Sequence, residues 1–209
     1  MNAFDPAVFH CPGFFIKAAG APFERAGAAA LRRRVFVEEQ KIFEHHDRDA
    51  IDDVATCLVA LSTYAHEADE VVGTVRIHEA EPGLWWGSRL AVDSRFRNVG
   101  RLGQQLIRLA VSTANGRGCD RFLAHVQMQN VPLFEKLAWA VEDEVVIHGV
   151  PHALMCADLA SYPPFADPES GWLSLTRTGR GRAIPVSLPA CHEVPALLPP
   201  LEQIHRGAA

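Results

Sequence analysis

Two spacings of hydrophobic residues alternate along this chain. Short apolar runs between turn residues predict β-strands at 14–17, 54–62, 71–78, 85–92 and 121–126, with a polar turn over 66–70 and a hairpin over 145–157. Apolar residues on one helical face predict helices at about 22–37, 102–116 and 130–137. The order β-α-β-β-β-α-β-α-β-β predicts an α/β (α+β) fold, with a mixed, mostly antiparallel central sheet and helices on both faces.

The segment 87–109 joins a buried strand directly to a helix through an Arg- and Gly-rich turn. The unpaired N–H groups and the dipole at the start of a helix favour an anion. Glycines let a ligand approach the backbone closely. The basic residues and glycines of the turn are Arg95, Arg97, Gly100, Arg101 and Gly103. The segment predicts a site for a pyrophosphate, although an ordinary strand-to-helix connection also contains such glycines.

This turn resembles the Arg/Gln-x-x-Gly-x-Gly/Ala motif of the GNAT superfamily of acyl-CoA-dependent N-acyltransferases. Residues 97–103 read Arg-Asn-Val-Gly-Arg-Leu-Gly, so the last glycine comes one residue late. Either Leu102 fills the final small position or the loop carries one extra residue. The resemblance implies the GNAT fold and acetyl-CoA or another acyl-CoA as co-substrate, without a metal. The residues implied to hold it are Leu90, Ala91, Val92, Arg97, Asn98, Val99, Gly100, Arg101, Leu102, Gly103 and Gln104.

Residues 129–139, Gln-Asn-Val-Pro-Leu-Phe-Glu-Lys-Leu-Ala-Trp, resemble a second GNAT motif, Asn-x-x-x-Leu-Tyr-Glu-Lys-x-Gly-Phe. By this resemblance Asn130 and Phe134 flank the CoA arm. Phe134 stands where many members have a tyrosine that can protonate the departing thiolate, and a phenyl ring has no proton to give. In an enzyme, another group or water would protonate the thiolate.

Two branches of the superfamily share further stretches with this chain, and the whole resemblance covers about residues 14–160. Residues 31–92 look similar to acyl-homoserine-lactone synthases, which move an acyl group from an acyl carrier protein to S-adenosylmethionine. Residues 35–40 and 149–155 also resemble bacterial ElaA-type proteins. The synthase pattern expects a glutamate where Trp86 stands, which argues against lactone synthesis. The acceptor side implied by these resemblances comprises Phe36, Asp49, Asp52, Arg76 and Trp86, with Asp49 and Asp52 contacting a cationic acceptor.

Acylation of an amine needs a base beside the thioester carbonyl. The resemblance places an oxyanion-stabilising N–H within 90–92 and favours Ala91 or Val92 for it. It places the usual glutamate base at Trp86, so that base is missing. His125 is our first candidate, because an imidazole with a pKa of about 6.5 accepts a proton near neutrality. The alternative is that His125 is a hydrogen-bonded core residue of its strand. Glu79 is the second candidate and His152 the third.

Strand alternation predicts the direction of the side chains in 85–92. Trp86, Ser88, Leu90 and Val92 share one face, and Trp85, Gly87, Arg89 and Ala91 share the other. If Trp86 faces the cleft, the acceptor pocket is flat and apolar and suits an aromatic or aliphatic amine. The alternative is a strand that is simply packed on both sides.

Composition narrows the class of protein. A chain of 209 residues with 48% hydrophobic and 22% charged residues can bury a core, and its length favours one domain or one domain with an appendage. Its net charge of −5 gives no general attraction to nucleic acid or to a membrane. The five cysteines are dispersed and no membrane-length apolar segment occurs, which predicts the cytoplasm. The histidines and aspartates within 45–53 match no metal-binding spacing.

The character of the chain changes at Ser161. Prolines become frequent, but Trp172, Leu173 and other apolar residues exceed what a solvated tail contains. We expect a GNAT acyltransferase domain over 1–160 and a Pro-rich extension over 161–209. The extension packs as an arm across the domain or across the second subunit of a homodimer, or it is a linker.

Together these features predict a GNAT-type acyltransferase (EC 2.3.1.-) that moves an acetyl or other short acyl group from acyl-CoA directly to a small-molecule amine. Two other functions stay open. A non-catalytic acyl-CoA-binding or regulatory module would explain why Trp86 and Phe134 replace proton-handling residues. An acyl-carrier-protein-dependent acyl-homoserine-lactone-type synthase would need a basic docking surface at Arg32–Arg34.

Overall fold

The computed structural model describes residues 8–9, 13–64, 67–99, 101–175 and 184–185. The chain forms two compact units, residues 11–181 and residues 1–10 with 182–209. In the second unit, β1 (Val8–Phe9) and β10 (Ile184–Pro185) form an antiparallel pair.

One sheet of eight strands organises the unit of residues 11–181, in the order β7-β8-β6-β5-β4-β3-β2-β9. All neighbouring strands are antiparallel except β5 and β6, which are parallel. The mixed, mostly antiparallel sheet confirms the predicted fold class. Its strands are β2 (Gly13–Ala18), β3 (Thr56–Tyr64), β4 (Glu67–Glu81), β5 (Leu84–Val92), β6 (Arg121–Gln127), β7 (Trp139–Ile147), β8 (Val150–Ala157) and β9 (Trp172–Leu175).

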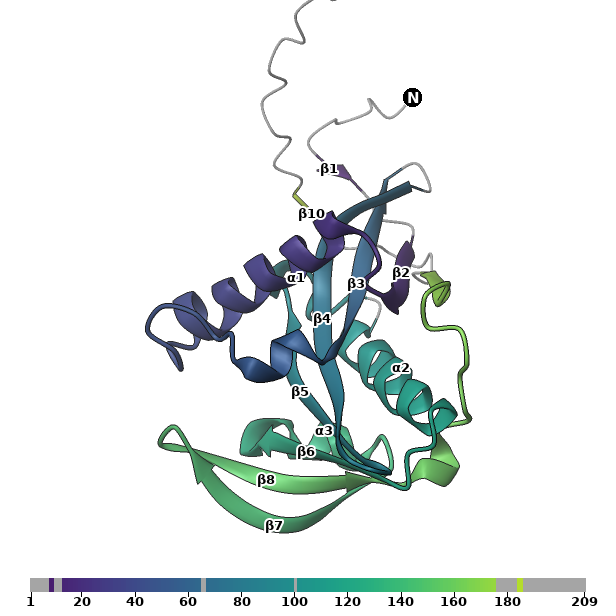
Figure 1. The fold of residues 1–209 in the computed structure, drawn as a ribbon. Coiled ribbons are helices and arrows are strands. Elements are labelled where there is room, and N and C mark those ends of the chain that lie inside the picture. The colour runs from purple at the N-terminus through teal and green to yellow at the C-terminus, as the bar shows by residue number, and fades with distance from the viewer. Residues whose placement is uncertain (1–7, 10–12, 65–66, 100, 176–183, 186–209) are drawn as a thin grey trace, which may run out of the picture. The chain divides into compact units, whose positions relative to one another are not determined.

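Helices cover both faces of the sheet (Figure 1). On one face, Leu31 of α1 (Pro22–Arg33) packs with Val59 and Leu61 of β3. On the other face, Leu106 of α2 (Leu102–Gly116) lies against Gly73 of β4. The shorter helical segments are the π-helical Arg34–Glu39, α3 (Val131–Glu135) and four 3₁₀ turns at Ala50–Asp53, Ser94–Phe96, Met128–Asn130 and Leu159–Ser161. No helix in the described ranges combines the length and the apolar composition needed to cross a bilayer.

The strands differ from the sequence prediction at several points. β4 already begins at Glu67, within the predicted polar turn, because residues 67–68 pair with β3. The hairpin begins at Trp139 and turns through His148 and Gly149, whose φ angles are +49° and +74°. Two residues with positive φ make the tight turn that suits the twist of a hairpin. β9, from the segment after 161, pairs with β2 at the edge of the sheet.

The parallel pair β5 and β6 separates partway along its length. Pairing runs only from Leu84–Gly87 against Arg121–Ala124. Beyond that point β5 continues with β4, while β6 continues with β8 as far as Gln127. Each strand therefore keeps one partner and leaves an opening between them in the middle of the sheet.

Candidate active site

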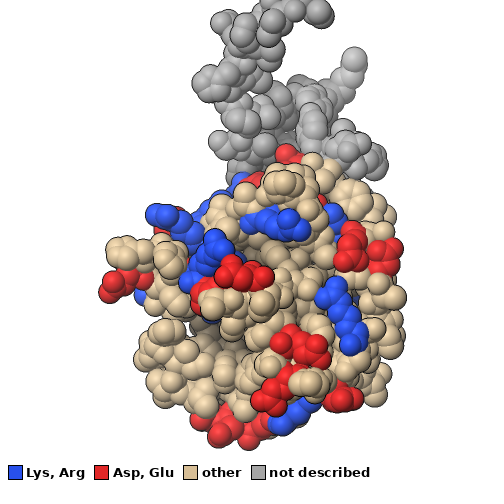
Figure 2. All heavy atoms as spheres, in the orientation of Figure 1, with Lys and Arg blue, Asp and Glu red and all other residues tan. Residues whose placement is uncertain are grey.

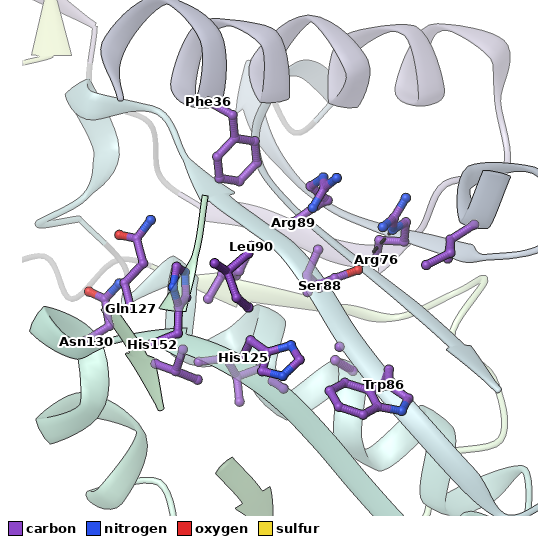
Figure 3. A pocket seen from close by; sticks show the side chains of 18 of the residues that line it. Phe36, Arg76, Trp86, Ser88, Arg89, Leu90, His125, Gln127, Asn130 and His152 are labelled. Carbon is purple, nitrogen blue, oxygen red and sulfur yellow. Dashed lines mark hydrogen bonds between the residues drawn. The ribbon is translucent and has the colours of Figure 1, made fainter. Parts of the chain in front are cut away.

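A cavity of about 530 Å³ occupies this opening. Phe36 and Arg76 line it from the face covered by α1, and Ile107 lines it from α2 on the opposite face. The cavity therefore passes through the sheet between β5 and β6. Figure 3 shows Phe36 pointing down from the helical side toward Leu90, with Trp86 and His125 on the sheet.

The predicted phosphate turn leads into the start of α2. Arg101 precedes the helix in the left-handed conformation, with φ +51°. The Leu102 side chain is fully buried in the core, whereas a Cβ built on Gly103 meets nothing within 4 Å. Open space therefore lies beside the backbone at Gly103, where the first N–H groups of the helix lack helical partners. Gly100 lies outside the described residues, while Asn98 and Val99 stand in the turn and Gln104 in the first helical turn.

The arginines of this turn differ in their partners. Arg97 donates through Nε to the Val92 carbonyl at 3.1 Å and pairs with Glu39. Arg101 is exposed and has no ion pair within the described part of the chain. An incoming phosphate would therefore meet the charge of Arg101 first, and Arg97 would have to leave Glu39. Arg95 pairs instead with Asp93 and Glu70.

The second predicted motif also reaches the cavity. Asn130 and Phe134 both line it. The Phe134 ring packs edge-on against Trp139, with 5.1 Å between the ring centroids. This packing gives Phe134 a place in the wall of the cavity, but its ring offers no proton. Leu90, on β5, lines the cavity beside this wall, whereas the Ala91 side chain is buried in the core under α1.

Trp86 faces the cavity and packs against His125 with the two rings tilted. Their ring centroids lie 5.0 Å apart, with 38° between the planes. Trp86 pairs in register with His78 on β4 and with Leu123 on β6, two residues before His125. The period of two along a strand therefore puts His78, Trp86 and His125 on one face of the sheet. His78 is a lining residue that we did not predict from the sequence, although its place opposite Trp86 explains it.

Burial favours the neutral form of two histidines of the cavity, His78 and His125. Burial and the positive field of His152 lower the pKa of His125 from its ordinary 6.5. Burial and the Arg76 charge lower the pKa of His78 in the same way. His152 lines the cavity, and its Nδ1 donates a hydrogen bond to the Val150 carbonyl at 2.8 Å, which orients the ring. At pH 7 the neutral imidazole of His125 can accept a proton.

Glu79 does not reach this site. It pairs with Trp85, on the face away from Trp86, and its carboxylate accepts a hydrogen bond from the Gly83 N–H at 2.9 Å. The prediction of Glu79 as a base is therefore wrong. Its carboxylate instead stabilises the turn between β4 and β5. The reason is register: β4 continues to Glu81, so position 79 points to the opposite side from His78.

A β-bulge corrects the predicted orientation of Arg89. Ser88 of β5 pairs with Arg76 of β4, and the next pair is Ala91 with Thr74. Two residues lie between these partners on β5 but one on β4, so β5 carries one extra residue. Arg89 takes a φ of +56° there. The bulge turns the Arg89 side chain toward the same loop that Arg76 contacts. The simple alternation that grouped Arg89 with Trp85 fails because a bulge shifts the period by one residue.

The loop between α1 and β3 is tied to the sheet by an ion-pair network. Its members are Arg32, Arg76 and Arg89 with Asp47, Asp49 and Asp52. Arg76 holds Asp49 with two hydrogen bonds of 2.6 and 3.1 Å and lies 2.9 Å from Asp52. Burial alone would raise the pKa of Asp52, but hydrogen bonds from Arg32 and the arginine charges outweigh burial and lower it. Both carboxylates already have arginine partners. Contact of Asp49 and Asp52 with a cationic acceptor stays a prediction.

The structure bears on two further hypotheses from the sequence, a basic docking surface at Arg32–Arg34 and a metal site. Arg32 is buried in the network, Arg33 lies 3.6 Å from Glu38, and Arg34 pairs with Asp93. The basic surface that an acyl-carrier-protein-dependent synthase would need is thus neutralised at these positions. Within the described residues, no group of histidine, cysteine, aspartate and glutamate side chains is placed to hold a metal ion. Figure 2 shows acidic and basic side chains interspersed on the face drawn there.

A family model and a related sequence match this chain. The model of the Acetyltransferase (GNAT) family matches residues 26–139. YyaT, an uncharacterized protein of Bacillus subtilis (strain 168), is 25% identical over 134 residues, which make up 64% of this chain and 88% of YyaT.

Solved structures share the fold. A candidate N-acetyltransferase from Lactobacillus plantarum superposes with a TM-score of 0.62 at 26% identity, covering 70% of this chain and 98% of that one. ElaA of Escherichia coli superposes with a TM-score of 0.57 at 19% identity, covering 69% of this chain and 98% of ElaA. The CoA-dependent acyl-homoserine lactone synthase BjaI superposes with a TM-score of 0.57 at 16% identity, covering 77% of this chain and 95% of BjaI. At those lower identities the likeness concerns the fold. Because the family model spans more than half of the chain, this protein belongs to the GNAT family of acyltransferases, which use acyl-CoA as the acyl donor.

Proposed function

We propose that this protein transfers an acetyl or other short acyl group from acyl-CoA directly to the nitrogen of a small-molecule amine. The observation that carries the proposal is the cavity through the sheet, with the open start of α2 beside Gly103 and the Trp86–His125 pair on β5 and β6. A thioester threaded between the two strands would present its carbonyl to an amine held beside Trp86.

The donor would be held by backbone and by charge. The first N–H groups of α2 and the Arg101 guanidinium suit a pyrophosphate. The opening between β5 and β6 suits the pantetheine arm, flanked by Asn130 and Phe134. Leu90 lies at the bulge, outside the paired register with β4, and its N–H is our candidate for stabilising the oxyanion.

The reaction then needs one base. The amine nitrogen forms a bond to the thioester carbonyl carbon, and the proton on that nitrogen passes to His125. The C–S bond breaks as the carbonyl re-forms, and the CoA thiolate takes a proton from water, because Phe134 has none to give. His125 finally releases its proton to solvent. Trp86 supports the His125 ring from one side.

Incubation of the protein with acetyl-CoA and a mixture of small amines tests this function. We expect release of the CoA thiol together with an N-acetylated product that mass spectrometry identifies. Tight acetyl-CoA binding without any acylated amine would instead support the non-catalytic acyl-CoA-binding module. Transfer from an acyl carrier protein alone would support the synthase.

Arg101→Ala should weaken binding of CoA by about 10- to 100-fold, because a charge-assisted phosphate contact is worth about 1.5–3 kcal/mol. Alanine tolerates the positive φ of this position no better than arginine does, so the substitution removes charge with little change in backbone strain. Isothermal titration calorimetry with CoA measures the loss.

Arg97→Ala is the matched comparison. Its guanidinium already pairs with Glu39, so we expect a smaller loss of affinity than for Arg101→Ala. Wild-type affinity in Arg101→Ala would contradict the assignment of the phosphate site to this turn. Equal losses in the two variants would mean that Arg97 leaves Glu39 for the ligand.

A further inference from the structure

The acceptor side of the cavity has flat aromatic walls. On the sheet side, the Trp86 and His125 rings pack against each other with a tilt of 38° and 5.0 Å between their centroids. Phe36 lines the cavity from the π-helical segment Arg34–Glu39, and Phe43 lines it from the loop that follows. The Phe43 ring is fixed from two sides, by the Arg89 guanidinium at 4.8 Å and by the His148 ring at 5.2 Å. Rings held in this way favour a planar ligand that can stack between them.

Charge in the cavity disfavours a cationic ligand. Among the described lining residues, Asp49 is the single carboxylate. It is held by Arg76 through two hydrogen bonds and by Arg89 at 3.0 Å. Arg76 and Arg89 also pair with Asp52 and Asp47, so the carboxylates beside the cavity already have arginine partners. An ammonium group entering here would find no unpaired negative partner, and burying an unpaired charge is costly.

The remaining polar groups suit a neutral ligand. His78 lines the cavity, and its buried Nδ1 has no hydrogen-bond partner within the described part of the chain. His125 and His152 offer further ring nitrogens. Neutral imidazoles accept a hydrogen bond from an N–H group without needing a charge on it. The polar side of the cavity thus matches an uncharged amine.

We propose that the acceptor is an aromatic amine, with its amino group attached directly to a planar ring, so that it enters the cavity uncharged at pH 7. The ring stacks against Trp86 and the aromatic walls, and the amino group lies beside His125. This inference rests on the proposed N-acyltransferase function and adds the substrate class to it. Alkylamines and polyamines are disfavoured because they are protonated at pH 7, as lysine is with its pKa of about 10.4. This substrate class replaces the cationic acceptor that the sequence predicted for Asp49 and Asp52.

Aniline and benzylamine form the matched test pair. Both carry the same ring, but benzylamine has one methylene between the ring and a basic amino group. With acetyl-CoA saturating at pH 7, we expect kcat/KM for aniline to exceed that for benzylamine and for spermidine by at least about tenfold, equivalent to about 1.4 kcal/mol. The rate with benzylamine should rise with pH up to 9, whereas the rate with aniline should stay flat above pH 7, because only benzylamine is still losing a proton there.

The outcomes separate the substrate class from the function. Preference for benzylamine or spermidine at pH 7 would overturn the aromatic-amine class and leave N-acyl transfer intact. Acylation of no amine, with acetyl-CoA still bound, would overturn both. Trp86→Ala should raise KM for aniline by about tenfold without changing KM for acetyl-CoA, and Trp86→Phe should restore most of the loss. An unchanged aniline KM in Trp86→Ala would contradict the stacking role.

Discussion

His125→Gln is expected to lower kcat by about 10²- to 10³-fold, the usual contribution of a positioned base. Glutamine is similar in length and can still donate and accept hydrogen bonds, but it cannot take up a proton. The His125 ring lies in the cavity, and its stacking on Trp86 defines where it points. Steady-state rates with saturating acetyl-CoA and amine measure the loss directly.

The pH profile gives this prediction a second readout. Burial and the nearby His152 lower the pKa of His125 below 6.5. A base must be unprotonated, so kcat should be level around pH 7 and should fall only as the pH drops below 6.5. His125→Gln should lose this acid limb along with the rate.

His46→Gln is the matched control, because His46 is an exposed histidine of the loop after α1 and lies outside the cavity lining. It should keep the wild-type rate and pH profile. A His125→Gln variant that retains both the rate and the acid limb would contradict the assignment, and His152 would then be the histidine to replace next.

Arg76→Leu is expected to destabilise the fold by about 3–5 kcal/mol, the cost of removing one partner from a buried ion pair. The Arg76 side chain is only 4% exposed, and it serves Asp49, Asp52 and the Ser88 hydroxyl together. Leucine would leave these groups with an incomplete set of partners inside the protein. Urea unfolding at pH 7 measures the free energy of unfolding.

Arg48→Leu provides the control for this loss. Arg48 belongs to the same loop and pairs with Asp53, but both side chains are about 70% exposed. An exposed pair contributes little, so the change should stay within about 0.5 kcal/mol. Similar values for the two variants would contradict the idea that the network ties the loop to the sheet.

Acid should loosen the same network in the wild type. The folded pKa of Asp52 is lower than its ordinary 3.8, so this carboxylate adds stability above pH 3.8. That contribution is lost progressively as the pH falls below 3.8 toward the lowered value. Unfolding midpoints measured between pH 7 and pH 3 should therefore decrease mainly at the acidic end.

Local patterns in the sequence predicted the elements of this fold and the two GNAT motifs. Residues such as Leu102, Leu106 and Leu109 recur at helical spacing, and helix α2 indeed spans Leu102–Gly116. Turn residues marked the ends of most strands. These features depend on neighbours along the chain, so they can be read without knowing the fold. Trp86, His125, Asn130 and Phe134 all line the cavity, where the motifs and the strand pattern had suggested a site.

Contacts between distant parts of the chain decided the rest. The bulge at Arg89 depends on the register between β5 and β4, and Glu79 points away because β4 continues past it. Asp49 lies 27 residues from its partner Arg76. The sequence by itself determined the order of elements, the family and the segment that we propose as the donor site, because these follow from short-range spacing and motifs. Only the tertiary structure decided which charges are neutralised and which side chains face the cavity, because register, bulges and ion pairs form between strands and loops far apart in sequence.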